Sequence, residues 1–209
     1  MSAAYTFTLN SFKITNTRSV HEDTDFVSIA VAVGNNPPIT VPTKSMGDLN
    51  NGTFTVNLSI PNVAVPDGSV VAFSYSIVNT GHDKNTVEQA MQKAAGAAAS
   101  KAATAGAGVL GGAIGGPLGA GIATVGEAAA GWVLGKLENI LFANCDGPVA
   151  AGDHVFTAAQ LAQKTAGGHV LSLTDDNKGS DSPHGCGSNS RYFVTWSIAA
   201  RAVAVQGAH

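Results

Sequence analysis

Residues 54–78, FTVNLSIPNVAVPDGSVVAFSYSIV, decide the fold class of this chain. Apolar and polar side chains alternate with a period of two over 54–60 and again over 70–78, which is the pattern of strands with one buried face. Pro66-Asp67-Gly68 supplies a turn between the two runs. The stretch therefore predicts two neighbouring antiparallel strands that cover one core.

The same alternation continues on both sides of this pair. One run carries a phase slip near Ser11, which predicts a β-bulge. Thr157 is placed to cap a short helix between two later strands. Further strands are predicted at 5–15, 26–33, 39–41, 153–157, 169–174 and 191–201. Short strands at this spacing are typical of an antiparallel β-sandwich, here of about seven or eight strands.

A helical segment interrupts the strands between the fifth and the sixth. A helix is predicted to begin near Thr86 and to bury one narrow face of small or apolar side chains. That face consists of Val87, Met91, Ala94, Ala98 and Ala102. Gly115-Gly116-Pro117 should end this helix, and a second one is predicted over 118–142.

These predictions define one domain over 1–209. Residues 1–82 and 148–209 form the β-sandwich, and residues 85–143 form an inserted helical hairpin. The hairpin contains the sequence AATAGAGVLGGAIGGPLGAGIATVG (102–126), 25 residues without a charge, of which nine are glycine and seven alanine. The chain is therefore predicted to be mainly β with an α insertion rich in glycine and alanine.

The glycines of this hairpin recur at spacings of four, a pattern that lets two helix backbones pack closely. The predicted stripe is Gly108, Gly111, Gly112, Gly115, Gly116 and Gly119. Two interpretations stay open. An uncharged run of this length is a candidate for membrane insertion, yet the part before the Gly-Gly-Pro break is shorter than the roughly 20 residues that span a bilayer. The stripe is equally suited to a buried packing or oligomer interface.

Charge and composition restrict the partners. Charged residues make up 12% of the chain and the net charge is −3, with no basic tract. This argues against nucleic-acid binding, which needs clustered Lys and Arg, and against docking on anionic lipid by charge alone. The N-terminus lacks the pattern of a secretory signal. The sequence is therefore expected to be cytoplasmic or exported by a non-classical route.

The chain has two cysteines, Cys145 and Cys186, both in turn-like surroundings. Thiols in such positions often pair where the compartment is oxidising, so a disulfide between them is predicted. A zinc site is not expected, because no CxxC pair is present.

Acidic residues gather in loops that an antiparallel arrangement should bring to one end of the sandwich. The loops are 21–25, 46–51, 81–85, 145–147 and 175–181, and they hold nine of the 14 acidic residues. Calcium binds six to eight oxygen ligands from flexible loops. The predicted ligands are Asp23, Asp25, Asp83, Asp175, Asp176 and Asp181. The alternative is that Asp is simply a favoured turn residue.

Two functions from different classes follow. The first is a non-enzymatic, membrane-active or binding protein, whose sandwich presents the Gly/Ala hairpin and the acidic loops at one end. The second is a structural or self-assembling module, a homo-oligomer, in which the hairpin is permanently buried. A protein or glycan ligand is left open. An enzyme ranks third, because only His184, Cys186 and Ser188 offer a local catalytic set.

Overall fold

A computed structural model of the chain describes residues 2–18, 23–80, 84–111, 123–124, 147–178 and 190–201. The side chains of Ser2, Asp23, 107–111 and 123–124 are not described.

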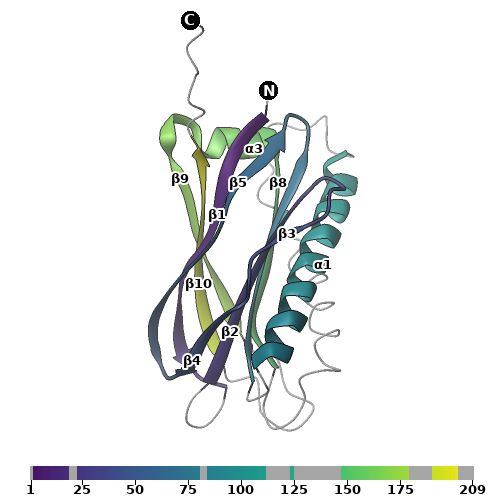
Figure 1. Cartoon of the computed structure of the whole chain (residues 1–209). Helices are drawn as coiled ribbons and strands as arrows, with labels where there is room; N and C mark the ends of the chain where they lie inside the picture. The colour runs from purple at the N-terminus through teal and green to yellow at the C-terminus, as the bar shows by residue number, and fades with distance from the viewer. Residues whose placement is uncertain are drawn as a thin grey trace, which may run out of the picture.

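Two antiparallel sheets face each other (Figure 1), which confirms the sandwich-like, mainly β fold. Sheet A has the order β5 (Gly52–Pro66), β1 (Ser2–Asn16), β10 (Arg191–Arg201) and β9 (Val170–Lys178). Sheet B has the order β3 (Ile39–Thr40), β2 (Asp23–Val33), β6 (Val70–Asn79), β8 (Gly147–Thr157) and β7 (Ala123–Thr124), and β4 (Lys44–Leu49) also pairs with β2. The predicted bulge is confirmed as a register shift between Leu9 and Ser11.

The core between the sheets holds the large side chains that the period-two pattern directs inward. Trp196, Phe7 and Phe73 are fully buried, and the Phe73 ring lies 5.9 Å from Phe7 and 5.7 Å from Trp196, measured between centroids. Burial of such side chains contributes about 1.5–3 kcal/mol each. These aromatic side chains therefore make a large contribution to the stability of the sandwich, beside the aliphatic residues of the same core.

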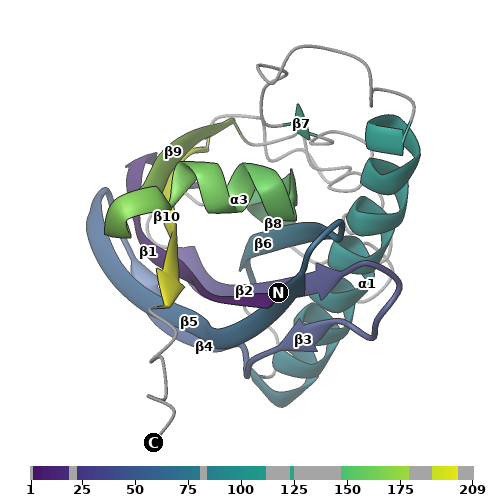
Figure 2. The same ribbon diagram turned by 90° about the horizontal axis from the view of Figure 1, so that it is seen from above.

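One end of the sandwich is closed by α3 (Ala158–Lys164), which crosses over the core as Figure 2 shows. Thr157 caps the helix as predicted: its Oγ1 accepts from the Gln160 amide, while the Gln160 side chain accepts from the Thr157 amide. Leu161 is fully buried and joins the central core. The short 3-10 helix η1 (Ala166–Gly168) then leads into β9.

Helix α1 (Lys84–Gly111) forms a third layer on the outer face of sheet B (Figure 2). The predicted buried face is confirmed, since Val87, Met91, Ala94, Ala98 and Ala102 are all less than 9% exposed. The helix begins at Lys84, two residues earlier than Thr86. The fold is thus a sandwich with a long helix between β6 and β7.

Two local predictions are wrong at the edges of sheet B. Residues 46–49, predicted as part of a loop, belong to β4, because the buried strand β2 offers them a free edge to pair with. Ala123–Thr124, predicted inside a second helix, form β7 on the edge of β8. In both cases an available sheet edge outweighs local propensity. The rest of the predicted second helix lies outside the described residues.

The two ends of the sandwich differ, and α1 runs between them. The end of β1, β6 and β9 and the start of α1 lie at one end, here called the acidic-loop end; the opposite end carries α3 and is called the α3 end (Figure 1). A helix of 28 residues is about 42 Å long. Gly106 packs beside Val155 and Val70, near the α3 end. The insertion leaves and re-enters the sandwich at the acidic-loop end, where Asn79 of β6 pairs with Gly147 of β8, whereas α1 itself runs to the α3 end.

Candidate functional site

The first half of α1 is anchored firmly to sheet B. Val87 and Met91 pack with Phe26 and Val78 in a small apolar cluster. Thr43 Oγ1 donates a hydrogen bond to the Glu88 carbonyl, at 3.0 Å. Near the edge of the sheet, the Gln92 side-chain amide donates to the Thr40 hydroxyl, also at 3.0 Å. Large side chains and hydrogen bonds thus hold this part of the helix in place.

The second half of α1, as far as its side chains are described, packs mainly through alanine, with Val155 and Val70 of the sheet beside it. We call this contact the alanine layer; it consists of Ala95, Ala99, Ala102 and Ala103 of the helix and Ala30, Ala32 and Ala72 of the sheet. All are buried, but each methyl contributes only about 0.8 kcal/mol. The Thr104 hydroxyl donates a hydrogen bond to the Ser100 carbonyl, at 3.0 Å, which stays within the helix. The attachment of α1 therefore weakens toward its C-terminal end.

Glycine is required where the helix comes closest to the strands. A Cβ added at Gly106 would lie 2.4 Å from Cγ1 of Val155, and one at Gly96 would lie 3.2 Å from Pro38 Cγ and from Thr40 Cγ2. Of the predicted glycine stripe, Gly108 and Gly111 belong to α1. Gly112, Gly115, Gly116 and Gly119 lie outside the described residues. No helix in the described part of the chain is long and apolar enough to cross a bilayer.

Four of the six predicted calcium ligands lie within the described residues, and all four belong to strands. Asp25 is buried and accepts a hydrogen bond from the Tyr192 hydroxyl, at 3.0 Å. Asp23 begins β2. Asp175 and Asp176, predicted in a loop, are consecutive residues of β9 and point to opposite faces of sheet A, so one ion cannot bind both. Within the described ranges, no three His, Cys, Asp or Glu side chains form a group suited to a metal.

Several predicted residues lie outside the described ranges. They are Asp83 and Asp181 of the calcium set, the predicted disulfide partners Cys145 and Cys186, and the catalytic set His184, Cys186 and Ser188. The calcium site and the disulfide stay predictions.

Asp175 is the centre of a partly buried polar cluster that sequence reasoning did not find. Its Oδ2 accepts three hydrogen bonds: from Tyr75 Oη at 2.7 Å, from His154 Nε2 at 2.7 Å and from Trp196 Nε1 at 3.0 Å. Asn177 donates to Tyr75 Oη at 3.1 Å. Tyr75 and His154 belong to sheet B, whereas Asp175 and Trp196 belong to sheet A. The cluster therefore links the two sheets at the side where β8 faces β9.

The electrostatics of the cluster favour an ionised Asp175. Burial pushes the pKa of Asp175 upward, but hydrogen bonds from His154, Tyr75 and Trp196 outweigh it and the net pKa is lowered. Burial, followed by the charge of Asp175, raises the pKa of Tyr75 well above its ordinary value. On the other face of sheet B, burial raises the pKa of Asp153, whose carboxylate accepts from Ser74.

In many enzymes a carboxylate that accepts a hydrogen bond from a histidine orients the imidazole for proton transfer. His154 is 3% exposed, and its second ring nitrogen, Nδ1, is buried without a hydrogen-bond partner among the described residues. No Ser, Thr or Cys of that same set bonds to the ring. The contacts of Asp175 and His154 that the structure describes link the two sheets. The inward-facing phase of β9 includes Leu171, Leu173 and Asp175, and this signal could have identified Asp175 as a partly buried acid that faces the other sheet.

We expect acid to weaken the fold through Asp175. Its pKa in the folded protein is lower than in the unfolded chain, so its contribution to stability is complete above about pH 4 and is lost as the pH falls through the folded pKa. Urea unfolding between about pH 2.5 and 7 should show this loss. In the Asp175→Asn variant, the free energy of unfolding should fall less steeply as the pH is lowered. Asp153→Asn should have the opposite effect and make this fall steeper. The pKa of Asp153 is raised in the folded protein, so its ionisation lowers the stability as the pH rises, and the variant lacks that loss. A parallel decline in Asp175→Asn and wild type would contradict this account.

No protein-family model matches the chain, and no characterised protein is detectably similar to it in sequence.

Proposed function

We propose that this chain is a non-enzymatic, membrane-active protein, in which the sandwich is a rigid scaffold and α1 is a releasable arm. The observation that carries the proposal is the graded attachment of α1. Its first half is held by Val87, Met91 and two side-chain hydrogen bonds, while its second half rests on the alanine layer. Release would therefore begin at the C-terminal end of the helix, near Gly106, and pivot about the anchored half.

The composition of the interface supports release for a second reason. When a helix leaves a sheet, both surfaces become exposed to water, and the cost rises with the apolar area exposed. The alanine layer keeps that area small. The uncharged sequence that follows α1, beginning at Gly112, supplies the segment that would enter a membrane. Its glycines would allow close helix packing there.

The alternative is a structural or self-assembling module with α1 permanently in place. The close fit of Gly106 against Val155 favours it, because tight packing of small residues is also how a permanent interface is built. A constitutive oligomer on size-exclusion chromatography with no affinity for lipid would support this alternative.

A reversible covalent lock separates the two functions. The ideal Cβ position at Gly106 lies 3.4 Å from Cβ of Val155, close to the 3.5–4.5 Å typical of a disulfide. We expect oxidised Gly106→Cys/Val155→Cys to lose liposome flotation and dye release, and to regain both after reduction. Wild type treated with the same reductant shows whether reduction of Cys145 and Cys186 alone changes flotation. The single variants Gly106→Cys and Val155→Cys show the effect of each substitution without the disulfide.

Equal flotation of the oxidised double variant and of wild type would reject the releasable arm. Each flotation is run with excess calcium and again with chelator. Flotation only in calcium would support the predicted metal site, and flotation in both conditions would remove calcium from the proposal.

A further inference from the structure

The outer face of sheet A is not covered by another layer of the described structure. It carries an ordered array of hydroxyl groups. Two rows cross all four strands and consist only of Ser and Thr. The first row is Thr55, Ser11, Thr195 and Thr174, and the second is Ser59, Thr8, Ser197 and Ser172. Some of these hydroxyls bond to each other, as Thr174 does with Thr195 at 2.8 Å, which fixes their positions.

A groove of about 370 Å³ opens on this face, within the size range of small-ligand sites. Its lining is Ser11, Lys13, Thr53, Thr174, Phe193 and Thr195. Phe193 is half-buried and has the Arg191 guanidinium 4.9 Å from its ring centroid. Arg191 is itself fixed by two hydrogen bonds to Asp176, at 2.9 and 2.7 Å. The groove thus combines an aromatic ring, hydroxyls and a cation in fixed positions.

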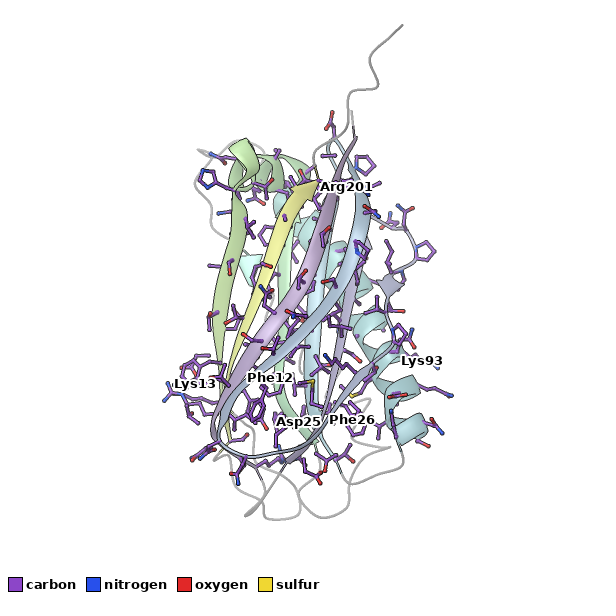
Figure 3. All side chains as sticks on the ribbon, turned by 60° about the vertical axis from the view of Figure 1, so that its left-hand side comes forward. Phe12, Lys13, Asp25, Phe26, Lys93 and Arg201 are labelled. Carbon is purple, nitrogen blue, oxygen red and sulfur yellow. The ribbon has the colours of Figure 1, made fainter. Side chains whose placement is uncertain are left out.

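The charge of this face is opposite to that of the chain. The described side chains that point outward from sheet A include four cations, Lys13, Lys178, Arg191 and Arg201, and one acid, Asp176. The whole chain has a net charge of −3. Lys13 is exposed and makes no hydrogen bond or ion pair within the described part, and Figure 3 shows it on the outer side of the sheet. An unpaired lysine in a groove favours an anionic ligand.

We infer that this face binds an anionic polysaccharide, with the groove around Phe193 as its main subsite. Ser and Thr hydroxyls both donate and accept hydrogen bonds, as sugar hydroxyls do. The Phe193 ring offers an apolar surface to the C–H face of a sugar ring. Lys13 would pair with a sulfate or carboxylate group of the polymer. The inference is independent of the proposed function, because it involves the opposite sheet from α1.

The test is titration with heparin, a sulfated polysaccharide, with alginate, a carboxylated one, and with neutral dextran. Heparin or alginate should bind and dextran should not, and the affinity should fall with added salt. Lys13→Glu should weaken binding about tenfold, because reversing a contact charge removes an attraction and adds a repulsion. Thr195→Val, which removes a hydroxyl at similar volume, should weaken it by about threefold.

Lys93→Glu is the matched control, since it makes the same charge change on the exposed side of α1, away from sheet A (Figure 3). It should leave the affinity within about twofold. The inference is overturned if neither anionic polymer binds, if dextran binds as well as heparin, or if Lys93→Glu acts as strongly as Lys13→Glu. Binding of glycan-free phosphatidylserine vesicles with the same dependence on Lys13 would also overturn it, in favour of a lipid surface.

Discussion

Replacement of Asp175 by alanine should lower the free energy of unfolding by about 4 kcal/mol, because it leaves three donors without an acceptor. Tyr75, His154 and Trp196 all donate to the same carboxylate oxygen. A buried donor that loses its partner costs about 1–3 kcal/mol. The Asp175 side chain is 26% exposed, so water can replace part of what is lost. Urea denaturation at neutral pH, followed by tryptophan fluorescence and by circular dichroism, measures the effect.

Asp176→Ala provides the matched control for this experiment. The two acids are neighbours in β9, but Asp176 points outward and pairs with Arg191, with 40% of its side chain exposed. Exposed ion pairs contribute little to stability, so the control should change the unfolding midpoint far less. Equal effects of Asp175→Ala and Asp176→Ala would show that the buried cluster does not link the sheets.

Introduction of a single methyl group at Gly152 should be almost as damaging, with a loss of about 3 kcal/mol. A Cβ at this position would lie 2.6 Å from Cε1 and Cζ of Tyr75 and 2.7 Å from its hydroxyl oxygen. Gly152 and Tyr75 are cross-strand partners in β8 and β6. The ring is 2% exposed and cannot move aside without breaking its hydrogen bond to Asp175.

A double-mutant cycle tests this explanation. Gly152→Ala should cost much less in a Tyr75→Leu background, where the obstructing ring is absent. Thermal and urea unfolding of the four proteins gives the coupling energy. If Gly152→Ala were equally destabilising in both backgrounds, its effect would come from the backbone and not from contact with Tyr75.

The structure places its two candidate interaction surfaces on opposite layers. Helix α1 covers sheet B, whereas the hydroxyl rows and the groove around Phe193 lie on the outer face of sheet A. The aromatic core and the Asp175 cluster between the sheets hold these surfaces in a fixed relation.

Most of the strands and the buried face of α1 could be predicted from the sequence, because they depend on local periodicity. Strand β10 matches the predicted range 191–201, and the Thr157 cap matches in detail. Each depends on residues within a few positions of one another. Alternation and capping express the same physical requirement, that apolar side chains be buried and backbone groups bonded.

The candidate sites depend on tertiary structure. Asp175 was predicted as a loop ligand for calcium, but its bonds join residues 21 and 100 positions away. The cations of sheet A come from β1, β9 and β10 and form no basic tract in the sequence, so their common face appears only after the strands pair. The position of the C-terminal end of α1 also depends on tertiary structure, because the helix is long enough to run from one end of the sandwich to the other. Local patterns determine which face of an element is buried, whereas pairing of distant strands decides which residues meet.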